Sequence, residues 1–132
     1  MVVDTSALLA IYFAEPDSSR FEAAILQTPA ATMSAGTLLE AAVVVEARHG
    51  KAETVEFDRL LKKLGVSTIA VDAEQVAAAR LGYRKYGKGR HPAGLNYSDL
   101  FAYALATTSG EPLLFKGDDI SKTDVVNALG ER

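Results

Sequence analysis

Residues 1–14, MVVDTSALLAIYFA, contain the change of pattern that decides the fold. Val2 and Val3 form a short apolar run that predicts a buried strand. Three residues that favour helix N-termini follow it directly, from Asp4 to Ser6, and Ala7 to Ala14 then predicts a helix. A buried strand that leads at once into a helix is typical of proteins in which helices cover a parallel sheet.

The rest of the chain continues this alternation, with breaks at Pro29, Gly50 and Gly65. Further strands are predicted at 30–33, 66–71 and 113–115, and further helices at 16–26, 35–48, 52–64, 73–86 and 99–108, the last capped by Ser98. The segment 125–129 predicts a short strand or helix. The sequence therefore predicts one α/β domain, residues 1–132, with a central, mainly parallel sheet of four to five strands flanked by helices.

The composition agrees with one compact domain. Hydrophobic residues make up 48% of the 132, enough for a single core, and the 23% of charged residues argues against disorder. The chain has no cysteine, which excludes disulfides and thiolate metal sites. It has neither a basic leader nor an apolar run near the ~20 residues that span a bilayer, so we expect a cytoplasmic protein with no membrane partner.

The charges are distributed unevenly along the chain. The net charge is -3, but residues 80–91 hold five basic residues and no acid, namely Arg80, Arg84, Lys85, Lys88 and Arg90. The remainder of the chain is therefore strongly acidic. An acidic body with one basic strip can hold cations and also contact phosphates, although a solvated helix face is the plain alternative.

Five acids stand next to apolar segments: Asp4, Glu40, Asp99, Asp118 and Asp119. A buried carboxylate without a partner is costly, so acids gathered from distant parts of a chain suggest a divalent cation as counter-charge. Asp4 and the Asp118–Asp119 pair follow strands, and Asp99 begins a helix, so the topology can bring them to one edge of the sheet. Glu40 lies in a helix that we expect to be largely buried, with no basic residue three or four positions away.

Each acid also has a local explanation. Asp4 can cap its helix, Asp99 can favour a helix dipole, and Asp118 and Asp119 can be turn residues. As a group they fit metal-assisted phosphodiester hydrolysis, because magnesium prefers oxygen ligands and can activate a water. Zinc fits less well, since His49 and His91 show no ligand spacing, and the sequence contains no glycine-rich phosphate loop.

Four segments resemble a known family. Residues 1–8 resemble the start of PIN-domain proteins, as does Glu40 after 37–39. Residues 95–106 look like the third acidic motif of the VapC toxins within that family, and 113–120 with Thr123 and Asp124 is similar to the fourth. The resemblance implies a PIN-like fold and a Mg2+- or Mn2+-dependent ribonuclease toxin that cleaves RNA. It also implies homodimers that a VapB-type antitoxin holds inactive in a hetero-oligomeric complex, often with an arginine near the acids.

The resemblance also assigns roles to residues. It implies that the catalytic acids are Asp4, Glu40, Asp99 and Asp119, and that Asp4, Asp99, Asp119 and additionally Asp118 bind metal. Ser6 and Thr123 would orient waters or phosphates, and Asp124 would support the ligands from behind. Beside this site, the basic residues Lys88, Arg90 and His91 just upstream of Asp99 are expected to contact the RNA backbone.

Two other functions remain open at this point. One is a PIN-like module without catalytic activity that only binds a partner. The other is a phosphatase with Asp4 as nucleophile, which is disfavoured because such enzymes usually carry a second Asp where Ser6 stands.

Overall fold

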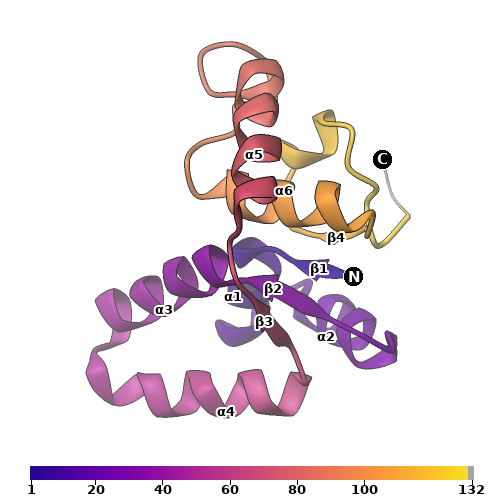
Figure 1. The fold of residues 1–132 in the computed structure, drawn as a ribbon. Coiled ribbons are helices and arrows are strands. Elements are labelled where there is room, and N and C mark those ends of the chain that lie inside the picture. Colours follow the sequence, from indigo (N-terminus) through magenta and orange to yellow (C-terminus); the bar gives the residue numbers. More distant parts are fainter. Residues whose placement is uncertain (131–132) are drawn as a thin grey trace.

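A four-stranded parallel sheet forms the centre of the protein in a computed structural model, which describes residues 1–130 (Figure 1). The strands are β1 (Val2–Val3), β2 (Thr32–Ser34), β3 (Ser67–Ile69) and β4 (Leu113–Leu114), in the order β3-β2-β1-β4. All three neighbouring pairs are parallel, with Val2 opposite both Thr32 and Leu113. The predicted α/β fold with a parallel sheet is therefore confirmed.

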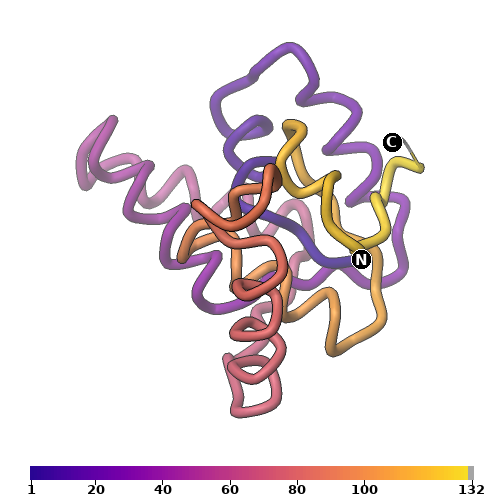
Figure 2. Tube along the Cα trace, turned by 90° about the horizontal axis from the view of Figure 1, so that it is seen from above, coloured from indigo at the N-terminus to yellow at the C-terminus, as the bar shows by residue number. Residues whose placement is uncertain are grey.

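Six α-helices connect and flank the strands. They are α1 (Thr5–Tyr12), α2 (Ser18–Gln27), α3 (Ala35–His49), α4 (Thr54–Leu64), α5 (Ala73–Tyr86) and α6 (Asp99–Ser109), with short 3-10 turns η1 (Lys51–Glu53) and η2 (Ile120–Lys122). Seen from above, β1 lies in the middle of the fold, between α2 on one side and α5 on the other (Figure 2). None of the helices in the described part of the chain is both long and apolar enough to cross a membrane.

The sheet separates two hydrophobic cores, because successive side chains of a strand point to opposite faces. Val3 and Leu114 belong to the larger core, which also contains residues of α1 to α4. Val2 and Leu113 belong to the second core, with residues of α6 and Ile120. Both faces of the sheet are thus covered, as expected for parallel strands made of continuous apolar residues.

Two glycines allow α6 to approach its neighbours closely. A Cβ atom on Gly36 of α3 would lie 2.4 Å from the Phe101 ring, and one on Gly82 of α5 would lie 2.3 Å from the Tyr103 ring. Larger residues would therefore push α3 and α5 away from α6. These contacts fix the helix that begins with Asp99 against the elements on either side.

The structure corrects three local expectations. The segment 125–129 is neither strand nor helix, and only Asn127 forms an isolated parallel bridge to Leu113. Helix α3 is not largely buried, because the side chains of Leu39 and Val43 are 65% and 56% exposed. The apolar residues around most of this helix predict burial, but the sequence does not say whether another element covers each side.

The third correction concerns the start of α6. Ser98 precedes the helix but makes no side-chain cap. Instead the side-chain oxygen of Asn96 accepts a hydrogen bond from the Asp99 N–H (3.0 Å), and the Ser98 hydroxyl also donates to it (2.8 Å). An Asn side chain caps from this position because it bonds the backbone of a turn as readily as that of a helix.

Candidate active site

Asp4 lies at the carboxyl end of β1 and is also the N-cap of α1. Its Oδ2 accepts hydrogen bonds from the Ser6 N–H (3.0 Å) and the Ser6 hydroxyl (2.6 Å). The residue is only 5% exposed. Asp4 therefore caps α1 with one carboxylate oxygen, which Ser6 occupies, and its other oxygen remains available for a functional role.

The pKa of Asp4 is raised from 3.8 to about 6, chiefly by burial; the Ser6 hydrogen bonds oppose this shift, and the charges of Asp99 and Glu40 add to it. A carboxylate with two such hydrogen bonds would otherwise ionise more easily. The two neighbouring acids come from α6 and α3, far away in the sequence. The fold therefore brings Asp4, Glu40 and Asp99 into one electrostatic group.

Asp99 is the first residue of α6 and is partly exposed. Its Oδ2 accepts a hydrogen bond from the Asn96 N–H (3.0 Å), which pairs with the opposite bond from the Asp99 N–H to the Asn96 side chain. Burial raises the pKa of Asp99, the bond from Asn96 opposes this, and the charges of Glu40 and Asp119 add to it. Asp119 thus joins the group.

Asp118 and Asp119 are both exposed, in the turn between β4 and η2. The turn is anchored by Ile120, which is 6% exposed and belongs to the second core. The Asp118 carbonyl accepts a hydrogen bond from the Ser121 hydroxyl. Of the two acids, it is Asp119 whose charge acts on Asp99.

Ser6 links the two strand ends that carry these acids. Its hydroxyl donates to Asp4 and accepts a hydrogen bond from the Lys116 N–H (2.9 Å), so the end of β4 is tied to the start of α1. The Lys116 ammonium in turn pairs with Glu15. Both bonds engage the Ser6 hydroxyl, which therefore holds the Asp4 carboxylate in place, while its expected role in orienting waters or phosphates stays a prediction. We could not foresee this link from the sequence, since Ser6 and Lys116 are 110 residues apart.

Thr123 and Asp124 lie where the turn leaves η2. The Thr123 hydroxyl donates to the Ile120 carbonyl (2.7 Å), which closes the turn internally. An Asp124 carboxylate oxygen accepts a hydrogen bond from the hydroxyl of Tyr103 on α6 (2.9 Å). The sequence analysis does not identify Tyr103, although its position one helical turn after Asp99 places it on the same face of the helix.

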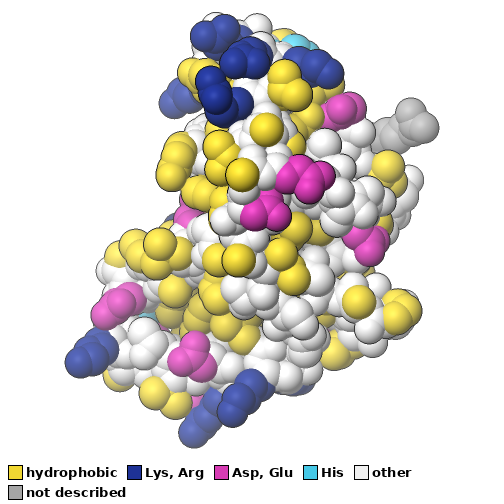
Figure 3. Space-filling model, in the orientation of Figure 1, with side chains coloured by type: hydrophobic (Ala, Val, Ile, Leu, Met, Phe, Trp, Pro, Cys, Tyr) yellow, Lys and Arg dark blue, Asp and Glu magenta, His cyan; other side chains and the backbone are white. Residues whose placement is uncertain are grey.

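The three basic candidates belong to a loop with its own hydrogen bonds. Lys88 donates its N–H to the Leu95 carbonyl (2.9 Å), and His91 Nδ1 accepts from the Ala93 N–H (3.0 Å). The Arg90 guanidinium lies over the Tyr83 ring, 5.3 Å from its centre. Lys and Arg side chains gather at the tip of α5 and this loop (Figure 3), and the loop leads directly into Asn96 and Asp99.

The donor set suits a hard divalent cation, but the geometry is open. Among residues 1–130, no group of three or more His, Asp or Glu side chains is arranged to hold a metal directly. Mg2+ commonly binds through only one or two carboxylates and keeps several waters. Burial is the main cause of the raised pKa of Asp4 and Asp99, and repulsion among the acids adds to it. A cation would favour the charged form of both acids, so the residues present fit such an ion.

The sequence of this chain is similar to those of known proteins along nearly all its length. The sequence model of the PIN domain family matches residues 1–126. The chain is 54% identical to Ribonuclease VapC of Mycolicibacterium smegmatis over 125 residues, which covers 95% of this chain and 97% of that protein. It is 53% identical to Ribonuclease VapC30 of Mycobacterium tuberculosis, with 95% of each chain covered.

Solved structures share the fold. The crystal structure of Mycobacterium tuberculosis VapC20, described as a sarcin-ricin loop cleaving toxin, superposes with a TM-score of 0.73 at 16% identity, covering 95% of each chain. A toxin-antitoxin complex from Klebsiella pneumoniae gives a TM-score of 0.70, also at 16% identity, and covers 95% of this chain and 93% of that one. The chain belongs to the PIN domain family and, within it, to the VapC ribonucleases.

Proposed function

We propose that this protein is a metal-dependent endoribonuclease toxin, that it acts in the cytoplasm, and that residues 1–132 work as one domain. The observation that carries the proposal is the electrostatic group at the carboxyl edge of the sheet. Four acids from separate segments gather there: the charges of Asp99 and Glu40 act on Asp4, and those of Glu40 and Asp119 act on Asp99. A structural role gives no reason to gather like charges, whereas a divalent cation bound among them would offset their repulsion. The identity with VapC ribonucleases supports the same reaction.

Asp4, Asp99 and Asp119 would hold Mg2+ or Mn2+, with Asp118 as an additional ligand. The bound ion would activate a water and stabilise the leaving oxygen of the phosphodiester. Glu40 would bind the ion or position the attacking water. Ser6 would keep one oxygen of Asp4 occupied and leave the other available to hold the ion.

The loop after α5 would orient the RNA. An acidic site repels a polyanion, so basic residues outside the site have to supply the attraction and the register. Lys88 is exposed at the tip, Arg90 lies beside it, and His91 is half-buried on the side of the loop that faces Tyr86. We infer that these three residues contact RNA phosphates.

We also infer that a VapB-type antitoxin neutralises the toxin, as the family implies. A cationic side chain of the antitoxin among the acids would relieve the same repulsion as a metal ion does. The Klebsiella pneumoniae neighbour is a toxin-antitoxin complex, which supports such a partner for this fold.

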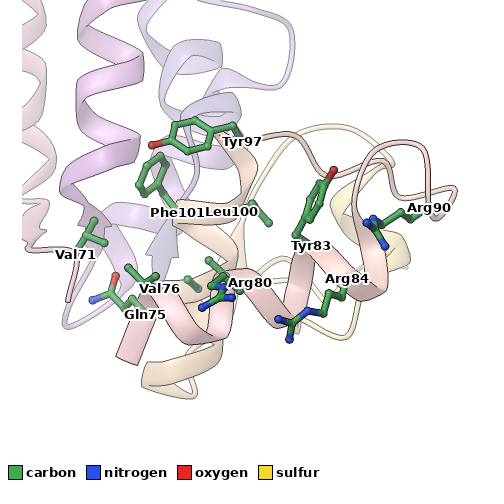
Figure 4. Close-up of a pocket in the computed structure, with 12 residues that line it drawn as sticks. Val71, Gln75, Val76, Arg80, Tyr83, Arg84, Arg90, Tyr97, Leu100 and Phe101 are labelled. Atoms are coloured by element: carbon green, nitrogen blue, oxygen red, sulfur yellow. The ribbon is translucent and has the colours of Figure 1, made fainter. Parts of the chain in front are cut away.

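We further propose a homodimer that forms through an apolar groove between α5 and α6 (Figure 4). Val76 and Tyr83 of α5 and Tyr97 at the entry of α6 line the groove and are 40–78% exposed. Such a surface indicates an interface. The N-terminal end of α5 carries Asp72 and Glu74, and its C-terminal half carries Arg80 and Arg84. Two antiparallel copies would therefore pair acid with base, as an isologous interface requires.

Neutralising two of the acids tests the reaction. We expect Asp4→Asn and Asp99→Asn each to lower cleavage of cellular RNA by at least about 100-fold, because each removes a charged ligand. Chelation of the metal should abolish cleavage by the native protein. Asp58→Asn, at an exposed position of α4, is the matched control. Variants that cut RNA as fast as the native protein would show that the site is wrongly assigned.

The raised pKa of Asp4 predicts a pH-dependent stability of the metal-free protein. The folded-state pKa of about 6 exceeds the ordinary 3.8, so stability falls as pH rises from about 4 to 6 and stays low above that. Asp4→Asn keeps a good N-cap and removes the charge. Its unfolding free energy should exceed the native value by up to about 3 kcal/mol at pH 7.5 and by little at pH 4.

Thermal melting in a chelator across pH 4–8 measures this difference. Asp72→Asn, at the exposed N-cap of α5, shows what the same substitution does at an ordinary cap. A constant difference between native protein and Asp4→Asn at all pH values would contradict the burial argument.

The proposed RNA contacts predict a change in salt dependence. Lys88→Ala and Arg90→Ala should each weaken RNA binding and flatten the plot of log K against log salt by about 0.7 for every lost phosphate contact. Binding is measured without metal, so that the RNA stays intact. Lys62→Ala on α4, remote from the loop in Figure 1, controls for net charge. An unchanged slope across the series would count against these contacts.

The proposed dimer is tested by mass in solution. Light scattering should give twice the mass of one chain for the native protein. Val76→Asp should give the mass of one chain, because it places a charge in the apolar groove. Val126→Asp introduces the same charge at a position that is 68% exposed outside the groove, and should leave the dimer intact. A native monomer at micromolar concentration would refute the proposal.

A further inference from the structure

The segment that carries Asp118 and Asp119 is held at both ends by hydrogen bonds to other elements. At its start, the Lys116 N–H donates to the Ser6 hydroxyl. At its end, the Tyr103 hydroxyl donates to Asp124. Between these two points Asp118 and Asp119 are exposed, while the buried Ile120 and backbone hydrogen bonds such as that from the Lys122 N–H to the Asp119 carbonyl (3.1 Å) fix the local shape of the turn. These internal contacts shape the turn itself, so its placement relative to Asp4 and Asp99 depends on how firmly both ends are held.

The hydrogen bond at Tyr103 links the helix that begins with Asp99 to the segment that carries Asp119. Tyr103 follows Asp99 by one turn of α6 and so lies on the same face of that helix. Tyr103 is only 3% exposed. Its ring lies so close to Gly82 that a Cβ atom at that position would clash with it. The ring also packs edge-on against the Tyr86 ring, with 6.1 Å between the two ring centres. The phenol is therefore a rigid extension of the helix that carries Asp99.

Asp124 is exposed overall, and its Oδ1 accepts the phenolic proton at 2.9 Å. Hydrogen bonds to an ionised acceptor are stronger than those between neutral groups. Burial, followed by the bond to Asp124, raises the pKa of Tyr103 to about 12, so the phenol stays a donor at every physiological pH. This hydrogen bond ties α6 to the C-terminal end of the segment that carries Asp118 and Asp119.

We propose that Tyr103 is a positioning residue of the ribonuclease site, which acts by holding Asp124 and thereby setting the distance between Asp99 and Asp119. This role rests on the proposed function, because the two acids matter as a pair only if they share a cation. Residues behind metal ligands typically change metal affinity or activity about 10- to 100-fold. In this role the Asp124 carboxylate is an acceptor for Tyr103 and does not touch the metal.

The test compares variants that remove the bond with one that preserves it. Tyr103→Phe and Asp124→Ala should each lower kcat/KM for RNA cleavage by about 10- to 100-fold. The double variant should be no worse than either single one, because the same bond is lost. Asp124→Asn keeps an acceptor oxygen for the phenol and should retain most of the native activity. In metal-free protein, amides 117–124 should exchange hydrogen about tenfold faster in the first two variants than in native protein.

Tyr12→Phe is the matched control. In the native protein the Tyr12 hydroxyl on α1 donates a hydrogen bond to the Glu53 carboxylate on η1 (2.6 Å). The variant therefore loses a comparable tyrosine–carboxylate bond elsewhere in the fold. It should lower the melting temperature without changing cleavage or exchange at 117–124. If Tyr103→Phe behaves in the same way, the positioning role is wrong.

Two other outcomes also decide. If Asp124→Asn is as inactive as Asp124→Ala while Tyr103→Phe stays active, Asp124 acts directly on metal or RNA and the proposal is overturned. If the native protein cleaves no RNA at all, the proposed function fails. Hydrogen exchange in the metal-free variants still tests whether the bond between Tyr103 and Asp124 holds the segment in place, since this measurement needs neither RNA nor metal.

Discussion

The parallel pairing of β1 with β4 is the constraint on which the site depends. Parallel neighbours end at the same edge of a sheet, so the residue after β1 and the turn after β4 have to lie side by side. In this chain both positions carry acids, and α6 adds a third at its first residue. The backbone hydrogen bonds of the sheet thus hold like charges together that would separate in a free chain. Hydrogen bonds from Ser6 to Asp4 and from Asn96 to Asp99 offset part of the cost of that proximity.

The compensation uses local hydrogen bonds with a double purpose. Ser6 stabilises the Asp4 carboxylate and at the same time bonds the backbone of Lys116. Asn96 caps α6 and also donates its N–H to Asp99. These bonds oppose the rise in pKa without removing it, because burial outweighs them at both acids. The acids are therefore held in place while their repulsion remains, a condition that would favour the cation proposed for this site.

The sequence predicted what depends on local pattern. Strand ends, helix starts and breakers follow from periodicity and from Pro and Gly, so the sheet and the positions of Asp4 and Asp99 could be foreseen. The bond between Tyr103 and Asp124 could not, because it joins residues 21 positions apart that carry no shared pattern. Nor could the exposure of Leu39 and Val43 on α3, since an apolar face is compatible with a sheet, a neighbouring helix or a second copy of the chain. The cap of α6 was assigned to Ser98 instead of Asn96, because both residues favour such positions and only the turn geometry distinguishes them.

The separation of basic and acidic residues is consistent with the proposed binding and cleavage of RNA by one small domain. A phosphate that enters the acid group without a cation meets only repulsion, so attraction has to come from outside the group. Helices α5 and α6 are consecutive and pack against each other, and the loop between them ends at Asn96 and Asp99. That loop carries the basic residues. The connection therefore places the attractive charges next to the repulsive ones without mixing them. If the basic residues stood within the acid group, they would pair with the carboxylates and compete with the proposed cation. A short loop away, they would be able to bind the proposed RNA substrate while the acids stay free for the ion.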